Sequence, residues 1–199
     1  MKQLFFILIV LLGIINLQGQ TKKTQALIDE IAGQWETDEN KNLFYQKVIE
    51  MPGVDKSMLF QRAENYFIYN YGSGKDVIQT KDKEQGLIIG KGIWPNIYFG
   101  VSIGSYKFGA DHILRIDIKD EKARITLTVQ RYNVEYRYDK TVMDYPALLL
   151  GTYPINADSK SKTMEGKAFY NLHQKCVNTL NNLTDNMKND AIKQTNSSW

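Results

Sequence analysis

The fold is decided by the stretch Leu114-Arg115-Ile116-Asp117-Ile118-Lys119-Asp120-Glu121-Lys122-Ala123-Arg124-Ile125-Thr126-Leu127-Thr128-Val129. Large apolar residues alternate with charged or hydroxyl residues on both sides of the polar turn at 119–122. Successive side chains of a strand point to opposite faces of a sheet, so this period of two predicts an antiparallel hairpin with one buried face. The other face of the hairpin is expected to be solvated.

Beyond Val129 the apolar positions have even numbers, and they are Tyr132, Val134, Tyr136 and Tyr138. A change of parity turns the apolar side chains to the other face of the sheet unless one residue is added to the strand. We therefore predict a β-bulge near Gln130-Arg131, with the strand continuing in the same sheet.

Before this hairpin, the sequence predicts a strand, a helix and a second hairpin. Residues 43–51 are strand-like and end at a Pro-Gly pair. Asp55 can cap the N-terminus of a helix over 55–71, which a Gly-Ser-Gly sequence ends. Two short apolar runs, 77–80 and 87–93, flank a polar turn and predict the hairpin.

The last third of the chain is expected to be a loop followed by a helix. Residues 139–163 contain two prolines and a wholly polar end, so we expect a loop there. A helix over 164–193 is predicted by one apolar stripe, whose members are Phe169, Leu172, Cys176, Leu180, Leu183, Met187 and Ala191. These residues recur at steps of three and four, as on one side of a helix. Cys176 is therefore expected to be a buried, unreactive thiol.

Residues 1–19 have the layout of a secretory signal peptide, with positive Lys2, the apolar run Leu4 to Ile15 and small Gly19. A membrane span needs about 20 apolar residues, so cleavage is favoured and an uncleaved anchor is the alternative. We expect a periplasmic or secreted protein with no membrane span after cleavage. The chain's one cysteine, Cys176, is far from the cleavage site, so attachment through a lipidated N-terminal cysteine is not expected.

The rest of the chain is long enough for one domain and short for two. We expect a lead-in segment at 20–42, which has a short helical pattern, and a single α+β domain at 43–193. One cysteine allows no internal disulfide, so the core itself must stabilise the fold. The formal net charge is only +3, without a clustered basic region, so nucleic acid is not an expected partner.

Three segments then carry a family resemblance: Met58-Leu59-Phe60-Gln61-Arg62-Ala63, Asp76-Val77-Ile78-Gln79, and residues 81–92, which end in Gly90-Lys91-Gly92. In this order they resemble the exported bacterial family known as domain of unknown function 4468, which has a TATA-binding-protein-like fold. The resemblance covers residues 43–137. It implies an antiparallel sheet with helices on one face, in the order β-α-β-β-β-β-α, and an envelope or secreted protein. The family brings no known activity or functional residues, and the stretch Trp94 to Phe108 departs from its usual turn.

Gly100-Val101-Ser102-Ile103-Gly104 matches the G-x-S-x-G motif of serine hydrolases. That chemistry needs a serine on a strand-to-helix turn and a histidine base. Extended sequence follows Ser102, and the two histidines of the chain are His112 and His173. A secreted ester or amide hydrolase using Ser102 is therefore the alternative, and small residues in a twisted strand are the preferred interpretation. Two distant histidines and one cysteine give no metal-ligand spacing, so we expect no metal or cofactor.

Six aromatic residues form the candidate partner-binding surface: Trp94, Tyr98, Tyr106, Tyr132, Tyr136 and Tyr138. Tyrosine and tryptophan combine rigid apolar area with a polar tip, which suits a sugar, peptide or protein. The competing interpretation is that these rings pack under the C-terminal helix or the 139–163 loop. The sequence thus predicts a noncatalytic exported module that binds an envelope protein or a small ligand, and it sets no oligomeric state.

Overall fold

The computed structural model describes residues 22–71, 77–101, 104–138, 141–146 and 162–189. Residues 22–30 are helical. The elements that follow are β1 (Glu36–Thr37), β2 (Leu43–Glu50), α2 (Lys56–Asn70), β3 (Ile78–Asp82), β4 (Leu87–Val101), β5 (Ser105–Lys119), β6 (Lys122–Tyr138), β7 (Thr141–Pro146) and α4 (Lys162–Lys188). The predicted signal peptide lies outside the described residues.

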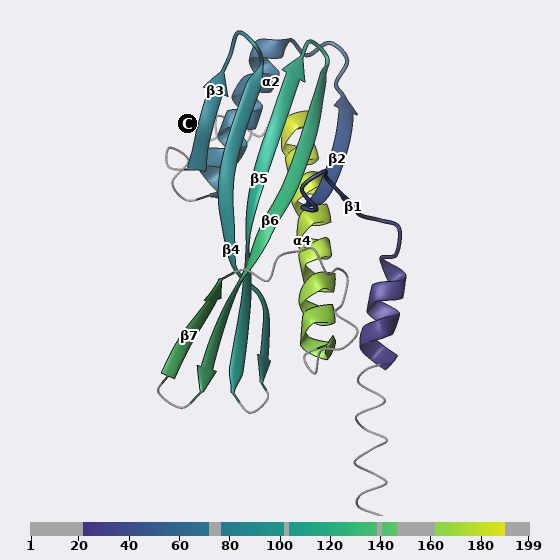
Figure 1. The fold of residues 1–199 in the computed structure, drawn as a ribbon. Coiled ribbons are helices and arrows are strands. Elements are labelled where there is room, and N and C mark those ends of the chain that lie inside the picture. The colour runs from purple at the N-terminus through teal and green to yellow at the C-terminus, as the bar shows by residue number, and fades with distance from the viewer. Residues whose placement is uncertain (1–21, 72–76, 102–103, 139–140, 147–161, 190–199) are drawn as a thin grey trace, which may run out of the picture.

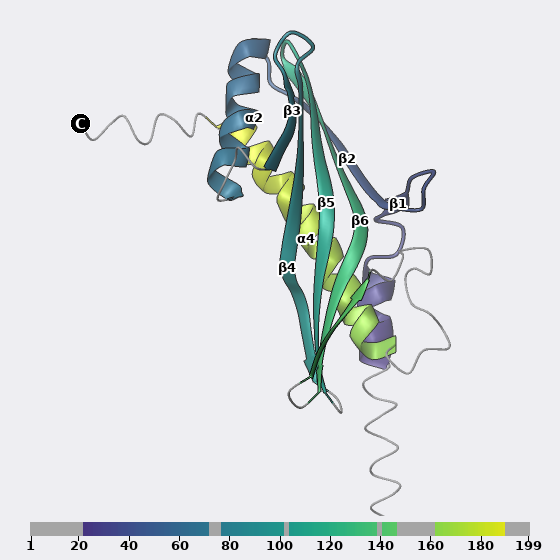
Figure 2. The same ribbon diagram turned by 60° about the vertical axis from the view of Figure 1, so that its left-hand side comes forward.

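The strands form one antiparallel sheet in the order β1-β2-β6-β5-β4-β3, and β7 pairs with the far end of β6. Both α2 and α4 lie on one face of this sheet, as the edge-on view in Figure 2 shows. The predicted fold class, an α+β protein with helices on one face of an antiparallel sheet, is therefore confirmed. In the described part of the chain, no helix is both long enough and apolar enough to cross a bilayer.

The hairpin predicted from residues 114–129 is present as β5 and β6. Ile116 lies opposite Ile125, and Leu114 opposite Leu127. All four side chains are fully buried on the helix side of the sheet. Alternation along the strand therefore sets the register, because a slip by one residue would bring the charged positions into the core.

The bulge predicted near Gln130-Arg131 is also confirmed. Asp111 pairs with Arg131 while the next residue, His112, pairs with Val129, so Gln130 is the extra residue in β6. The bulge keeps the even-numbered apolar residues of the second half of β6 on the helix side. Val134 there is buried.

Helix α2 begins and ends within one residue of the range predicted for it. The carboxylate of Asp55 accepts a hydrogen bond from the backbone N–H of Met58 at 2.8 Å, which satisfies a free donor of the first turn. Leu59, Ala63 and Phe67 are fully buried against the sheet. The ring of Phe67 occupies the space where a Cβ at position 90 would lie, which explains the first glycine of Gly90-Lys91-Gly92.

Helix α4 buries the predicted apolar stripe. Its described members, from Phe169 to Met187, are at most 7% exposed; Ala191 lies outside the described residues. Burial raises the pKa of the Cys176 thiol far above its usual range, as expected of an inert core cysteine. The guanidinium of Arg62 on α2 donates to the carbonyl of Met187 at 2.7 Å and so joins the two helices.

Two segments differ from the sequence-based expectation. The expected lead-in at 20–42 contributes Ile28 and Ile31 to the core, and Trp35 packs edge-on against Phe169 with ring centroids 5.3 Å apart. The expected loop at 139–163 contains β7, which runs along the second half of β6. β7 is a short edge strand that ends at a proline, and it depends on pairing with one neighbouring strand. Its own sequence therefore carries little strand pattern.

Four strand segments project past the part of the sheet that α2 covers (Figure 1). We call this projection the β-arm: residues 98–101 of β4, 105–108 of β5, 133–138 of β6, and β7. The register of β4 shifts between Trp94 and Tyr98, around Pro95-Asn96, and the strand continues through the shift.

One edge of β4 is uncovered. Among the described residues, β3 pairs with β4 no further than Gly90, so the outer side of β4 has no partner strand from Lys91 onward. The side-chain amide of Asn171 on α4 donates to the carbonyl of Ile97 at 3.0 Å on this stretch.

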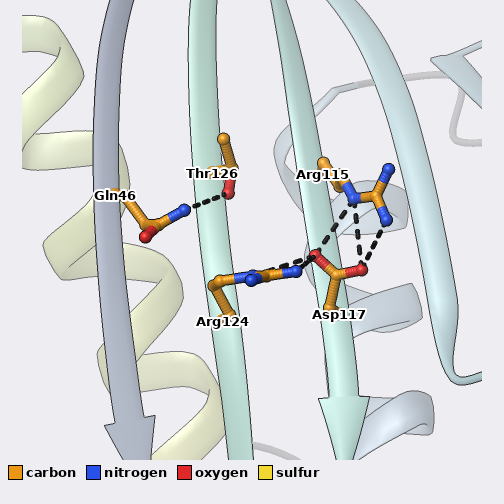
Figure 3. A network of polar contacts seen from close by, with 5 residues as sticks. All are labelled: Gln46, Arg115, Asp117, Arg124 and Thr126. Atoms are coloured by element: carbon orange, nitrogen blue, oxygen red, sulfur yellow. Dashed lines mark hydrogen bonds and ion pairs between the residues drawn. The ribbon is translucent and has the colours of Figure 1, made fainter.

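The sheet face opposite the helices is polar (Figure 3). The Asp117 carboxylate accepts from Arg115 at 2.7 Å and from Arg124 at 3.2 Å, and Gln46 donates to Thr126 at 3.3 Å. The hydrogen bonds from Arg115 hold the pKa of the Asp117 carboxyl below its usual range. These exposed pairs keep the outer face solvated and add little to stability.

Candidate ligand-binding cleft

A cleft of about 460 Å³ opens beside the uncovered edge of β4. Its walls come from the end of α2, the middle of β4 and the middle of α4. Residues lining the cleft include Tyr71, Lys91, Ile93, Trp94, Lys175 and Asn182. Clefts of this size accommodate small ligands.

Beneath the cleft, His112 lies between two aromatic rings. The Trp94 ring stacks on the imidazole with centroids 3.8 Å apart and planes 17° apart. The Tyr71 hydroxyl is 2.9 Å from His112 Nε2. His112 is fully buried, and its Nδ1 has no hydrogen-bond partner among the described residues.

Gly92 permits this arrangement. A Cβ at position 92 would lie 2.6 Å from Cε1 of Tyr71 and 2.7 Å from Cε1 of His112, closer than real Cβ atoms approach other heavy atoms. The second glycine of Gly90-Lys91-Gly92 is therefore required by the rings below it, while Lys91 between the glycines points to the other face. The motif sets the shape of the cleft.

Burial makes His112 a neutral side chain. It lowers the pKa of His112 to about 4, and the charge of Lys175 acts in the same direction while that of Asp111 opposes both. The pKa of Tyr71 is raised, mainly by burial. At neutral pH, Tyr71 and His112 are therefore both uncharged and joined by a hydrogen bond under the cleft. The pair presents no charge to a ligand.

We expect His112 to make the fold sensitive to acid. Its ordinary pKa of 6.5 falls to about 4 on folding, so between these values the unfolded chain binds more protons. Stability is then complete above pH 6.5 and is lost as the pH falls toward 4, by up to about 3 kcal/mol. Urea unfolding of the wild type and of His112→Gln at several pH values between 4 and 6.5 measures this loss of stability. The variant should be less stable at pH 7 but show a shallower pH slope, and equal slopes would contradict the prediction.

Lys175 gives the cleft a positive charge, while the side chain of Lys91 lies on the opposite face of the edge strand. Lys91 on β4 and Lys175 on α4 are exposed, and neither forms an ion pair with another described residue. The described lining contains no Asp or Glu. Asn182 and Thr179, also in the lining, add neutral polar groups.

The structure divides the six predicted aromatic residues between two places. Trp94 lines the cleft. Tyr98 and Tyr106 are half-buried against the core, and Tyr106 contacts Tyr136 across the β-arm with ring centroids 4.5 Å apart. Tyr138 is 52% exposed at the end of β6. Tyr132 is a residue of β6, and its side chain is outside the part of the chain that the structure describes.

Sequence reasoning missed the basic residues of the cleft and the pair formed by Tyr71 and His112. Gly90-Lys91-Gly92 was visible, and its glycines mark the close approach of aromatic rings. Lys175 lies on the polar side of the α4 pattern, where lysines are common, so no local signal singled it out.

The described surroundings of the alternative hydrolase's serine differ from those of a nucleophile elbow. Ser102 lies outside the described residues, but the flanking strands β4 and β5 pair as an antiparallel hairpin, with Val101 opposite Ser105. A nucleophile elbow requires a helix after the serine. His112 is seven residues along β5 from Ser105, roughly 23 Å at ~3.3 Å per residue. The other histidine, His173, is buried with Nδ1 3.0 Å from the Tyr45 hydroxyl.

No three His, Cys, Asp or Glu side chains of the described residues gather in a way that would hold a metal ion.

The antiparallel sheet with helices on one face places the protein in the TBP-like fold class. Two crystal structures share the fold: a TBP-like protein from Parabacteroides distasonis (14% identity, TM-score 0.51) and a DUF4468 family protein from Bacteroides ovatus (12% identity, TM-score 0.53). The match covers 77% of this chain in both cases, with 97% of the first structure and 91% of the second. At these identities the likeness concerns the fold alone.

Residues 45–133 match the family described as "Domain of unknown function (DUF4468) with TBP-like fold". The resemblance noted in the sequence is confirmed. No curated protein matches the chain.

Proposed function

We propose that this protein is a noncatalytic, exported binding module whose ligand site is the cleft between α2, β4 and α4. The observation that carries the proposal is a 460 Å³ cleft with aromatic walls, lined from α4 by the exposed Lys175. Small-molecule sites are usually concave clefts of about this size, in which placed polar groups orient the ligand. The signal-peptide pattern of residues 1–19 supports the exported location.

The state of the two histidines supports a binding role over catalysis. His112 and His173 are buried, and each faces a tyrosine hydroxyl. Burial lowers the pKa of both imidazoles. A general base works best with a pKa near the working pH and within reach of its substrate. Buried, weakly basic imidazoles fit a structural role better.

Blocking the cleft is the direct test. Asn182 is exposed on α4 and lines the cleft, whereas its neighbour Asn181 is exposed and accepts a hydrogen bond from Lys47 on β2. In Asn182→Trp, the indole should fill the entrance, and Asn181→Trp is the matched control on the same helix. Both variants should keep the thermal stability of the wild type within a few degrees.

The measurement is a heteronuclear NMR titration of the mature chain with a library of small acids, amines and neutral fragments. We expect shift changes that cluster at Lys91, Ile93 and Trp94, and that disappear in Asn182→Trp but not in Asn181→Trp. Fragments that bind only at other sites, or equally well to both variants, would contradict the proposal.

A further inference from the structure

The cleft meets the sheet along the backbone of β4. Four consecutive residues of that strand, 91–94, are part of its lining. The side chains of Lys91 and Ile93 lie on the outer face of the sheet, because they alternate with Gly92, and Ile93 is 62% exposed there. These two residues therefore present the edge of the strand to the cleft, with its N–H and C=O groups.

This stretch of open edge is bounded at both ends. On one side, β3 pairs with β4 no further than Gly90. Toward the β-arm, Pro95 has no N–H group, the register with β5 shifts, and the amide of Asn171 donates to the carbonyl of Ile97. Between these limits, no other strand of the described chain pairs with the outer side of 91–94. The open edge has the length of one short strand.

We propose that the ligand of the cleft is an extended peptide segment, which adds to β4 as a short strand beside residues 91–94. The inference rests on the proposed function, because it concerns the same site, and it adds the chemical class of the ligand. In an antiparallel strand every second residue turns both its N–H and its C=O to the same side, so the open groups recur about 7 Å apart. An extended peptide carries donors and acceptors at the same spacing, and main-chain hydrogen bonds give this mode of recognition its affinity.

The surroundings of the open edge set the side-chain pattern of such a peptide. Residues of an added strand alternate between the two faces of the sheet, as those of β4 do. On the cleft side they meet Lys175, Thr179 and Asn182, which follow one another on α4 at steps of four and three. On the outer face they lie beside the exposed Ile93. We therefore expect polar side chains toward α4 to alternate with an apolar side chain beside Ile93.

The probe is a library of blocked octapeptides in which polar and apolar residues alternate, with a blocked Gly-Ser octapeptide as its control. Binders are selected on the mature chain, and hydrogen exchange of the complex is followed by NMR. We expect alternate amides within 91–94 to exchange more slowly in the complex, because only the outward N–H groups gain a partner. A library without a binder stronger than the Gly-Ser control, or binders that protect no amide of this stretch, would overturn the proposal.

N-methylation of the best binder separates main-chain pairing from side-chain contacts. Two isomers are compared, with methyl groups on the amides of odd or of even residues, so that one isomer is blocked toward β4 and the other toward solvent. We expect one isomer to bind roughly tenfold or more weakly than the parent peptide, and the other to retain its affinity. Equal affinities of the two isomers would contradict the addition of a strand.

A variant on the outer face locates the peptide. Ile93→Ala should weaken the best binder several-fold, since it removes the apolar contact between neighbouring strands. Val48→Ala is the matched control, because Val48 is 60% exposed on the same face, on β2, with β6 and β5 between it and β4. Both changes shorten an exposed β-branched side chain, so both variants should keep the fold. Equal effects at the two positions would mean that the peptide does not lie beside β4.

The outcomes separate this inference from the proposed function. If small fragments bind and Asn182→Trp abolishes their binding, but no peptide protects the edge of β4, the cleft remains a ligand site and the peptide class is wrong. If the same amides become protected when the concentration of the protein alone is raised, the edge pairs with a second copy, and the class is again wrong. If neither fragments nor peptides bind at the cleft, the proposed function itself fails.

Discussion

A chain that ends after Thr163 is expected not to fold. This truncation removes nearly all of α4, whose stripe from Phe169 to Met187 is buried on the sheet. Burial of five large apolar side chains at about 1.5–3 kcal/mol each rivals the whole net stability of a typical domain, about 5–15 kcal/mol. The loss also removes the carbonyl of Met187, to which the buried guanidinium of Arg62 donates, and a buried charge that loses a partner is costly.

The measurement is the solubility of the truncated protein, its dye binding and its thermal unfolding followed by circular dichroism. We expect insoluble or dye-binding material with no cooperative transition. A chain that ends after Asn189 is the control, because it keeps all of α4, and it should unfold like the full protein. If the shorter chain stays soluble, monomeric and cooperative, α4 does not hold the core together as the structure indicates.

The second large effect is expected at Ile116 on β5. Its side chain is fully buried opposite Ile125. Truncation to alanine leaves a cavity in a packed layer, so Ile116→Ala should lower the free energy of unfolding by about 2–5 kcal/mol. Arg115, the preceding residue, points to the solvated face and pairs with Asp117 there (Figure 3). Arg115→Ala should cost under about 1 kcal/mol, as is usual for an exposed ion pair.

Urea denaturation of both variants under the same conditions compares the two faces of one strand. The difference between them is the decisive quantity, since both changes shorten a side chain on β5. Equal losses of stability at the two positions would mean that the strand does not alternate between core and solvent as described.

Local patterns predicted the elements whose chemistry is local. The alternation in residues 114–129, the change of parity at Gln130, the cap at Asp55 and the stripe of α4 each depend on a short window of sequence. In each case one physical requirement, a buried face or an unsatisfied N–H group, has few solutions. The structure confirms these predictions, with α2 within one residue of its predicted ends and α4 ending at Lys188, five residues before its predicted end.

The features that were missed depend on distant partners. β7 is a strand because it pairs with the second half of β6. Ile28 is buried because it packs against core residues from other parts of the chain. The cleft is the clearest case, since Trp94 and Lys175 come together only when α4 lies across β4. No window of sequence contains both residues. The hydroxyl that faces His112, on Tyr71 at the end of α2, is likewise set by tertiary packing.

The irregular stretch of β4 affects the tendency of this protein to aggregate. An uncovered strand edge is a template on which another chain can add a strand and begin a fibre. Along this edge Pro95 offers no N–H group, the register shifts between Trp94 and Tyr98, and Asn171 occupies the carbonyl of Ile97. An incoming strand would find the hydrogen-bonding ladder interrupted at its middle. The long β4 can therefore remain open beside the cleft while the protein resists growth into aggregates at high concentration.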